Sequence, residues 1–142
     1  MIMIKRFIQI GSVFALLIGL MVSAQAQKVN SYEASIPFDF SIGNKTFAAG
    51  DYAFGLTNPL ALQESLTIRD VKNGTTHVFL ITRDQADEFK GGAELTFNRY
   101  EDRYFLAEIA APTLSAKFLR AKSEARLAKS KTVKRESIAL KK

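Results

Sequence analysis

The stretch that decides the fold reads Tyr32-Glu33-Ala34-Ser35-Ile36-Pro37-Phe38-Asp39-Phe40-Ser41-Ile42, and it ends at the turn residues Gly43-Asn44. From Tyr32 to Ile42 every second residue is apolar or aromatic, and most positions between them are polar. This period of two predicts a half-buried β-strand, because successive side chains of an extended chain point to opposite faces. Pro37 has no N–H to donate, so we expect a sheet edge or a bulge there.

The alternation resumes after the turn, from Lys45 through Leu56, and further pairs of strands are predicted around Asn73-Gly74 and Glu101-Asp102. Residues 75–82 contain four consecutive apolar side chains, a run typical of a central strand covered on both faces. The total is about seven strands, with no helix signal before residue 114. The sequence therefore predicts an all-β fold, either an antiparallel sandwich or a small barrel.

The composition changes after residue 114. A stripe of apolar residues at helical spacing predicts a basic helix that docks through Phe118; its members are Phe118, Ala121, Ala125 and Ala128. From Ser130 onward few side chains can be buried, so we expect that end to be frayed or disordered. The predicted organisation is thus a leader in residues 1–26, a β-domain in 27–114 and a basic helical, partly disordered tail in 115–142.

The first 26 residues have the order of a secretory signal peptide. Lys5 and Arg6 precede an apolar run over residues 7–22, and Ala24-Gln25-Ala26 places small residues where a signal peptidase reads them. The alternative is an uncleaved anchor, but a run of 16 residues is shorter than the ~20 needed to span a bilayer. We therefore expect a periplasmic or extracellular protein with no membrane span after cleavage. The chain has no cysteine, so packing must hold the fold without disulfides.

The net charge of +6 is distributed unevenly. Residues 27–114 hold eight Lys and Arg against twelve Asp and Glu, a net charge of −4, whereas residues 115–142 hold ten against two, a net charge of +8. An acidic body does not indicate specific binding to nucleic acid. The basic tail predicts contact with an anionic envelope polymer or lipid head groups. The residues expected to make it are Lys129, Lys131, Lys134, Arg135, Lys141 and Lys142.

Few residues suggest catalysis or metal binding. His77 is the one histidine of the chain, and we interpret it as a partly buried residue satisfied by a neighbour rather than a ligand. The acidic cluster of Asp84, Asp87 and Glu88 lacks the spacing of a calcium loop, which favours a solvated loop. No nucleophile elbow, phosphate loop or dinucleotide fingerprint is present. No cofactor, metal or catalytic residue is predicted from these patterns.

Two function classes remain. The first is a non-enzymatic envelope-associated interaction module that uses its basic tail, and it is favoured because no residue pattern points to catalysis. The second is a small hydrolase or ligand carrier with a site of dispersed carboxylates and tyrosines. The hairpin residues Arg99-Tyr100 and Arg103-Tyr104 also suggest a surface patch of cations beside rings, with ordinary cross-strand pairing as the alternative.

The run Ile36-Pro37-Phe38-Asp39-Phe40-Ser41-Ile42-Gly43-Asn44-Lys45-Thr46, followed by Ala49-Gly50-Asp51-Tyr52, resembles small exported proteins of unassigned function from Gram-negative soil bacteria. The resemblance extends over residues 29–127 and does not cover 130–142. It implies a fold rather than an activity, since its motifs are strand and turn positions. Related sequences often have Gly where this chain has Glu101. The other similar segments are Phe97-Asn98-Arg99-Tyr100, Tyr104-Phe105-Leu106-Ala107-Glu108 and Lys122 to Leu127.

We predict cleavage after Ala26, which leaves Gln27 at the mature N-terminus. Intact-mass measurement of the exported protein checks the position. Ala24→Arg places a long charged side chain where a small one is required, so this variant should accumulate as the precursor. Recovery of the normal chain with Met1 still attached, in the membrane fraction, would contradict the prediction.

Overall fold

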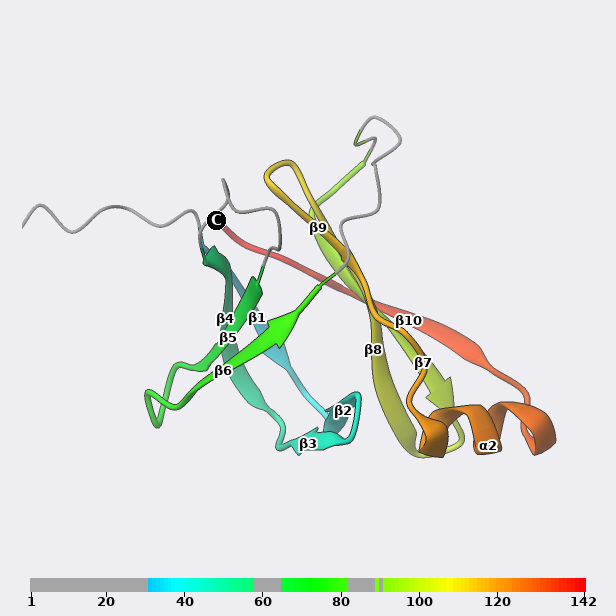
Figure 1. Ribbon diagram of the computed structural model, residues 1–142. Coiled ribbons are helices and arrows are strands. Elements are labelled where there is room, and N and C mark those ends of the chain that lie inside the picture. The colour runs from blue at the N-terminus through cyan, green and yellow to red at the C-terminus, as the bar shows by residue number, and fades with distance from the viewer. Residues whose placement is uncertain (1–30, 58–64, 82–88, 90) are drawn as a thin grey trace, which may run out of the picture.

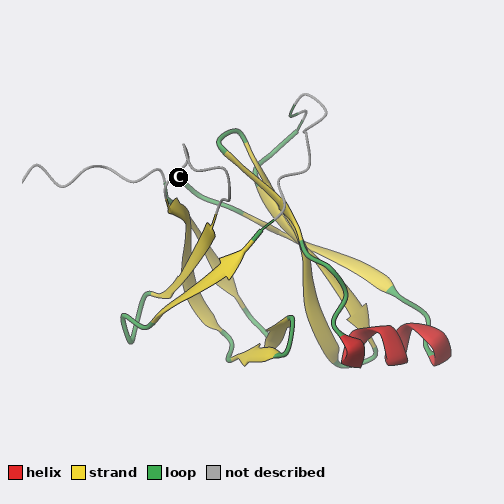
Figure 2. Cartoon of the chain, viewed as in Figure 1, coloured by secondary structure: helices red, strands yellow, loops and turns green. Residues whose placement is uncertain are grey.

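The computed structural model describes residues 31–57, 65–81, 89 and 91–142. The predicted signal peptide in residues 1–26 lies outside these residues. Within them the chain forms ten strands and one helix (Figure 2). No helix in this part of the chain is long and apolar enough to cross a membrane. The predicted fold class is confirmed: the protein is β-rich and sandwich-like, with two sheets that do not form a closed barrel and a helix near the C-terminus.

The first sheet has four antiparallel strands in the order β1-β4-β5-β6. Its last hairpin turns at the predicted position, although the loop has four residues, 71–74, rather than two. Gly74 in this loop has a φ of +71°, which glycine adopts without strain. The backbone N–H groups of Lys72 and Asn73 donate to the Asp70 carboxylate and hold this turn. The strands are β1 (Tyr32–Ile36), β4 (Gly50–Thr57), β5 (Ser65–Asp70) and β6 (Thr76–Leu80).

The second sheet has the order β10-β7-β8-β2-β3, and β9 also pairs with β8. All its pairs are antiparallel except β2 with β8, which is parallel, so the sheet is mixed rather than wholly antiparallel. β2 and β9 share one edge of β8, and β7 occupies the other. The strands are β2 (Phe40–Ile42), β3 (Lys45–Phe47), β7 (Glu94–Tyr100), β8 (Arg103–Ala111), β9 (Leu114–Lys117) and β10 (Lys134–Ala139).

The first hairpin of the chain belongs to both sheets (Figure 1). β1 pairs with β4 in the first sheet, and after a bend β2 pairs with β3 in the second. At the bend, residues 37–39 on one strand face only residues 48–49 on the other, so the bulge expected at Pro37 is confirmed. The Asp39 carboxylate accepts a 2.9 Å hydrogen bond from the Ala49 N–H and ties the two sides of the bend together.

The core lies between the two sheets and is rich in aromatic rings. Phe40, 1% exposed, packs within 6 Å of three other rings, those of Phe47, Tyr52 and Phe97. Phe38, which the alternation places on the same face, is only half-buried and stacks on Tyr104 with a centroid distance of 3.7 Å. Rings from both sheets therefore meet where the first hairpin bends. Stacked and edge-to-face pairs of this kind stabilise by about 0.5–1.5 kcal/mol beyond their burial.

The prediction for residues 75–82 is wrong in its placement. The strand forms as β6, but it lies at the edge of the first sheet, with its only described pairing to β5. Val78 and Leu80 are 61% and 70% exposed, while Phe79 between them packs against the core. A short apolar run does not distinguish a central strand from an edge strand, because both can carry it.

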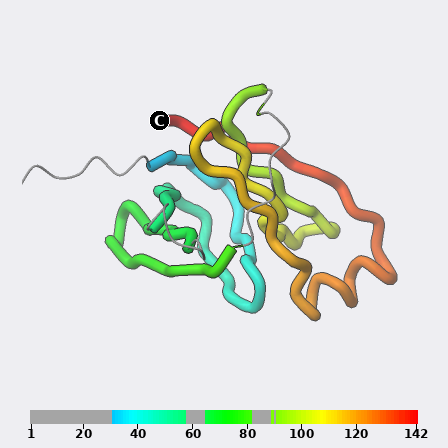
Figure 3. Tube along the Cα trace, turned by 45° about the horizontal axis from the view of Figure 1, so that its top comes forward, coloured from blue at the N-terminus to red at the C-terminus, as the bar shows by residue number. Residues whose placement is uncertain are grey.

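The prediction for the tail is correct in part. The helix forms as α2 (Lys122–Ser130), but residues 114–117 continue as β9, and the end of the chain is ordered. β10 pairs with β7 over six residues, so the expected disorder beyond Ser130 is wrong. Lys141 then exchanges two backbone hydrogen bonds with Glu33 of β1, at 2.7 and 2.8 Å. The C-terminus therefore joins the second sheet to the edge of the first (Figures 1 and 3).

Deleting residues 131–142 should destabilise the protein strongly, although the composition of this segment suggests a dispensable tail. The deletion removes β10, the core contact of Ile138 and the side chain of Leu140, which is 9% exposed. Burial of such side chains stabilises by about 1.5–3 kcal/mol each, so we expect a loss of about 3–5 kcal/mol in denaturant melts. The control is Lys141→Gln with Lys142→Gln, which keeps β10 and should change the unfolding free energy by less than about 0.5 kcal/mol. An unchanged melt for the deletion would contradict this.

Candidate functional site

Helix α2 is fastened to the outer face of the second sheet by a polar contact. Its buried residue is Glu124, which is 4% exposed and lies in the first helical turn. The Glu124 Oε1 atom accepts hydrogen bonds from Asn98 Nδ2 at 2.9 Å and from the Tyr100 hydroxyl at 3.2 Å. Arg120 Nε lies 3.9 Å from the same oxygen. A carboxylate in the first turn also interacts favourably with the helix dipole.

The predicted docking through Phe118 is confirmed only as a secondary contact. Phe118 is half-buried against the core, and its backbone N–H donates to the Ala107 carbonyl oxygen at 2.9 Å. It precedes the helix, however, and Ala125 and Ala128 within the helix are only half-buried. The position of α2 is therefore set mainly by Glu124, a residue that a search for apolar stripes does not select.

The turn between β7 and β8 carries a backbone outlier. Glu101 has a φ of +56°, whereas Asp102, the other central residue of the turn, does not have a positive φ. Positive φ at the first position alone is the pattern of a type II′ turn, in which glycine is usual. A residue other than glycine in this backbone conformation destabilises the fold by about 1–3 kcal/mol. The conformation is held by Arg99, whose Nε donates to the Glu101 carbonyl oxygen at 2.7 Å.

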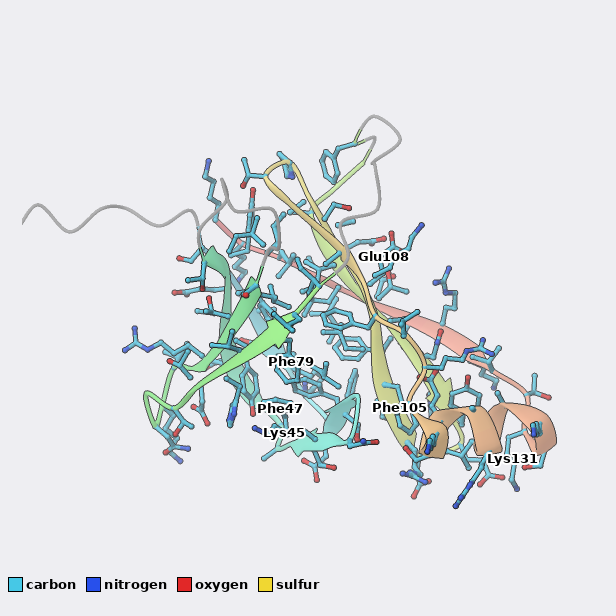
Figure 4. The ribbon with its side chains drawn as sticks, viewed as in Figure 1. Lys45, Phe47, Phe79, Phe105, Glu108 and Lys131 are labelled. Atoms are coloured by element: carbon cyan, nitrogen blue, oxygen red, sulfur yellow. The ribbon has the colours of Figure 1, made fainter. Side chains whose placement is uncertain are left out.

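A cleft of about 430 Å³ opens between this turn and the link from α2 to β10. Lys131 reaches across it, and its Nζ lies 2.7 Å from Glu101 Oε1 (Lys131 is labelled in Figure 4, beside α2). The hydrogen bond with Glu101 raises the pKa of the Lys131 ammonium group, so this cation is retained. We call this site the basic cleft; its lining residues are Arg99, Glu101, Ser130, Lys131, Thr132 and Lys134.

The structure brings together only some of the six residues predicted to bind anions. Lys131 and Lys134 line the basic cleft, whereas Lys129 lies in the last turn of α2. Arg135 follows Lys134 on β10 and so points to the other face of the sheet, 3.9 Å from Glu108. Lys141 and Lys142 lie at the far end of β10, next to β1. All six are exposed. The sequence prediction missed Arg99 and Glu101 because the fold brings them to the cleft from more than 25 residues away, and it missed Ser130 and Thr132 because it selected only basic residues.

The predicted patch on the β7–β8 hairpin does not form as one surface. Arg99 lies over the ring of Tyr104 and Arg103 over that of Phe105, each 5.3 Å from the centroid. Arg99 pairs with Tyr104, and Tyr100 pairs with Arg103, across the two strands. Tyr100 is 1% exposed. The alternative of cross-strand pairing is therefore confirmed, and Arg99 contributes to the basic cleft instead.

The remaining candidates from the sequence are His77 and the acidic cluster. His77 is half-buried, packs edge-on against Phe47 and has its Nδ1 atom 2.8 Å from Lys45 Nζ (Lys45 and Phe47 are labelled in Figure 4). An ammonium group can only donate, so Nδ1 accepts, as expected of a histidine satisfied by a neighbour. Asp84, Asp87 and Glu88 lie outside the described residues. Among the residues that the structure describes, no three His, Cys, Asp or Glu side chains gather closely enough to hold a metal ion.

Fold and site together define a small β-rich, sandwich-like protein with a basic cleft at one end of its second sheet. The chain matches no protein-family model, no curated protein and no solved structure at a significant level.

The buried tyrosines predict a loss of stability in alkali. Burial raises the pKa of the Tyr100 hydroxyl above its ordinary value of 10.0, and the Glu124 carboxylate raises it further. Burial likewise raises the pKa of Tyr52. Above pH 10 the unfolded chain releases these protons before the folded chain does, so stability is full below pH 10 and falls as the pH rises beyond it. Denaturant melts between pH 9 and 11 should show a shallower decline for Tyr100→Phe than for the unchanged protein. Equal slopes would contradict this.

Proposed function

We propose that this protein is an exported, non-enzymatic β-domain that attaches to anionic groups of the cell envelope through a basic surface. The surface comprises α2, its link to β10 and β10 itself. The observation that carries the proposal is the charge of this segment, ten Lys and Arg against two Asp and Glu within residues 115–142. The anionic groups are those of an envelope polymer or of lipid head groups. The localisation rests on the sequence of residues 1–26.

The basic segment is folded rather than disordered, and this supports the proposal. A disordered basic tail loses conformational freedom when it binds, and this loss weakens the contact. Here β10 is paired with β7, and α2 is fixed through Glu124. The cations are therefore held on a rigid element before any partner arrives, which reduces the entropic cost of binding.

An alternative account is that the basic segment serves only to neutralise the acidic body. Lys131 pairs with Glu101, and Arg135 lies 3.9 Å from Glu108. Exposed pairs of this kind contribute only about 0–1 kcal/mol each. Within the part of the chain that the structure describes, Lys129 and Lys134 form no ion pair. A surplus of exposed positive charge remains for an outside partner.

The second function class, a hydrolase or carrier with carboxylates and tyrosines, gains little support from this arrangement. Glu124 and Tyr100 do meet, at 3.2 Å, but both are buried beneath α2. A general acid or base must come within hydrogen-bond reach of its substrate. The pair instead fastens the helix to the sheet.

Binding to lipid vesicles tests the proposal. The purified exported form is mixed with phosphatidylcholine vesicles that either contain or lack phosphatidylglycerol. We expect it to bind only the vesicles that carry the anionic lipid. The affinity should fall steeply as salt rises from low concentration to about 0.15 M, where the Debye length shortens to about 8 Å. Absence of binding, or binding that salt does not weaken, would refute the proposal.

Two double variants that remove the same charge from different surfaces test which surface binds the vesicles. Lys129→Gln with Arg135→Gln removes two exposed cations of the basic surface that lie outside the cleft. Each cation near an anionic membrane contributes about 1 kcal/mol, or about fivefold in affinity, so the double variant should bind at least tenfold more weakly. Lys72→Gln with Arg69→Gln removes the same charge from the first sheet and should bind nearly as the unchanged protein does. Equal losses in the two variants would show that no particular surface is used.

A further inference from the structure

The lining of the basic cleft has one unusual member, Glu101. This residue takes a positive φ of 56° in a turn position where glycine is the usual choice. Glycine there would relieve the strain but would remove the carboxylate that lies 2.7 Å from Lys131 Nζ. Residues with a strained backbone conformation are often found at functional sites. The strain at Glu101 therefore points to a function of its carboxylate in the cleft.

The cleft lining has more positive charges and hydrogen-bond donors than the single Glu101 carboxylate can pair with. Arg99, Lys131 and Lys134 bring three positive charges to the lining, and Ser130 and Thr132 add two hydroxyl groups. Glu136 neutralises part of Arg99 through a 3.0 Å ion pair. Glu101 supplies one negative charge, so the lining keeps a positive surplus. The cleft volume, about 430 Å³, is in the range of sites for small ligands, ~300–1,000 Å³.

We infer that the basic cleft binds a phosphate monoester group, and that the Glu101 carboxylate is the partner of Lys131 when no such ligand is bound. The inference rests on the proposed function and names the group that the surface would recognise. Glu101 acts as a built-in competitor: its carboxylate leaves Lys131 when the phosphate enters. The group is carried by a phosphorylated sugar or by a lipid head group, which share this chemistry.

The competition with Glu101 selects the ligand. A carboxylate on an outside molecule carries the same single charge as Glu101, whereas Glu101 is tethered beside Lys131 at a high effective concentration. Exchange of one carboxylate for another therefore brings no advantage. A phosphate monoester carries −1.5 to −2 charge near pH 7 and three strong acceptor oxygens. It satisfies Lys131 and Lys134 together and also accepts hydrogen bonds from the two hydroxyl groups.

The test uses glucose 1-phosphate as a soluble probe and follows the backbone amide signals of the exported form by NMR. We compare Glu101→Gln with Asp102→Asn, a neighbouring substitution in the same turn that removes the same charge outside the cleft lining. Glu101→Gln should bind the probe at least fivefold more tightly than the unchanged protein, whereas Asp102→Asn should change the affinity by less than twofold. Lys134→Gln should weaken binding at least fivefold, and unphosphorylated glucose should not bind.

The outcomes separate this inference from the proposed function. If Glu101→Gln and Asp102→Asn tighten binding equally, the surface attracts anions without a built site and the inference is overturned, while salt-sensitive vesicle binding still supports the proposed function. If glucose 1-phosphate binds none of the variants, the inference is likewise overturned for a soluble source. A parallel titration with vesicles that contain phosphatidic acid covers the lipid source, and a stronger response of Glu101→Gln there supports the inference for a head group. No response from either source overturns it fully.

Discussion

The whole arrangement depends on one constraint: a single hairpin must contribute strands to both sheets. Its outer half, β1 with β4, belongs to the first sheet, and its tip, β2 with β3, belongs to the second. Pro37 cannot donate to a ladder, so pairing is interrupted where the chain must change direction. The Asp39 carboxylate then satisfies the Ala49 N–H at the bend. Because the hairpin turns there, Phe40 stacks on Phe47, meets Phe97 edge-on and so closes the core.

The second sheet contacts the core on one face and supports helix α2 and the basic cleft on the other side and at its end. β7 presents apolar residues such as Phe97 to the core and polar or aromatic residues such as Asn98 and Tyr100 to the opposite face. The outward residues hold Glu124, and through it α2. The end of α2 leads into β10, which returns along β7. The two walls of the cleft, the β7–β8 turn and the link before β10, are thus fixed by one strand.

The sequence predicts those strands and turns that depend on patterns over a few adjacent residues. The alternation from Tyr32 to Ile42 and the turn at Asn73-Gly74 each describe a few adjacent residues, and both appear at the expected positions. The strand total rises from about seven to ten because the bend divides the first predicted strand into β1 and β2, and because β9 and β10 are not predicted from the sequence. β10 has only Ile138 as a large apolar residue, so its pairing depends on the free edge of β7. Its many charges are themselves typical of edge strands.

The basic cleft could be predicted only in part, because it joins residues that are far apart in the sequence. Lys131 and Lys134 are visible as charges, but Arg99 and Glu101 become their neighbours only through the pairing of β10 with β7. The conformation of Glu101 follows from the register of β7 with β8, which residue types alone do not determine.

The backbone contact between Glu33 and Lys141 places the C-terminus beside the start of β1 (Figures 1 and 3). The basic cleft lies at the opposite end of β10, about 20 Å away at ~3.3 Å per strand residue. A linker, reporter or surface anchor fused after Lys142 would therefore emerge from the opposite end of the molecule. The protein could be immobilised through its C-terminus with the cleft directed outward, an orientation suited to displaying the cleft on a sensor or a bead.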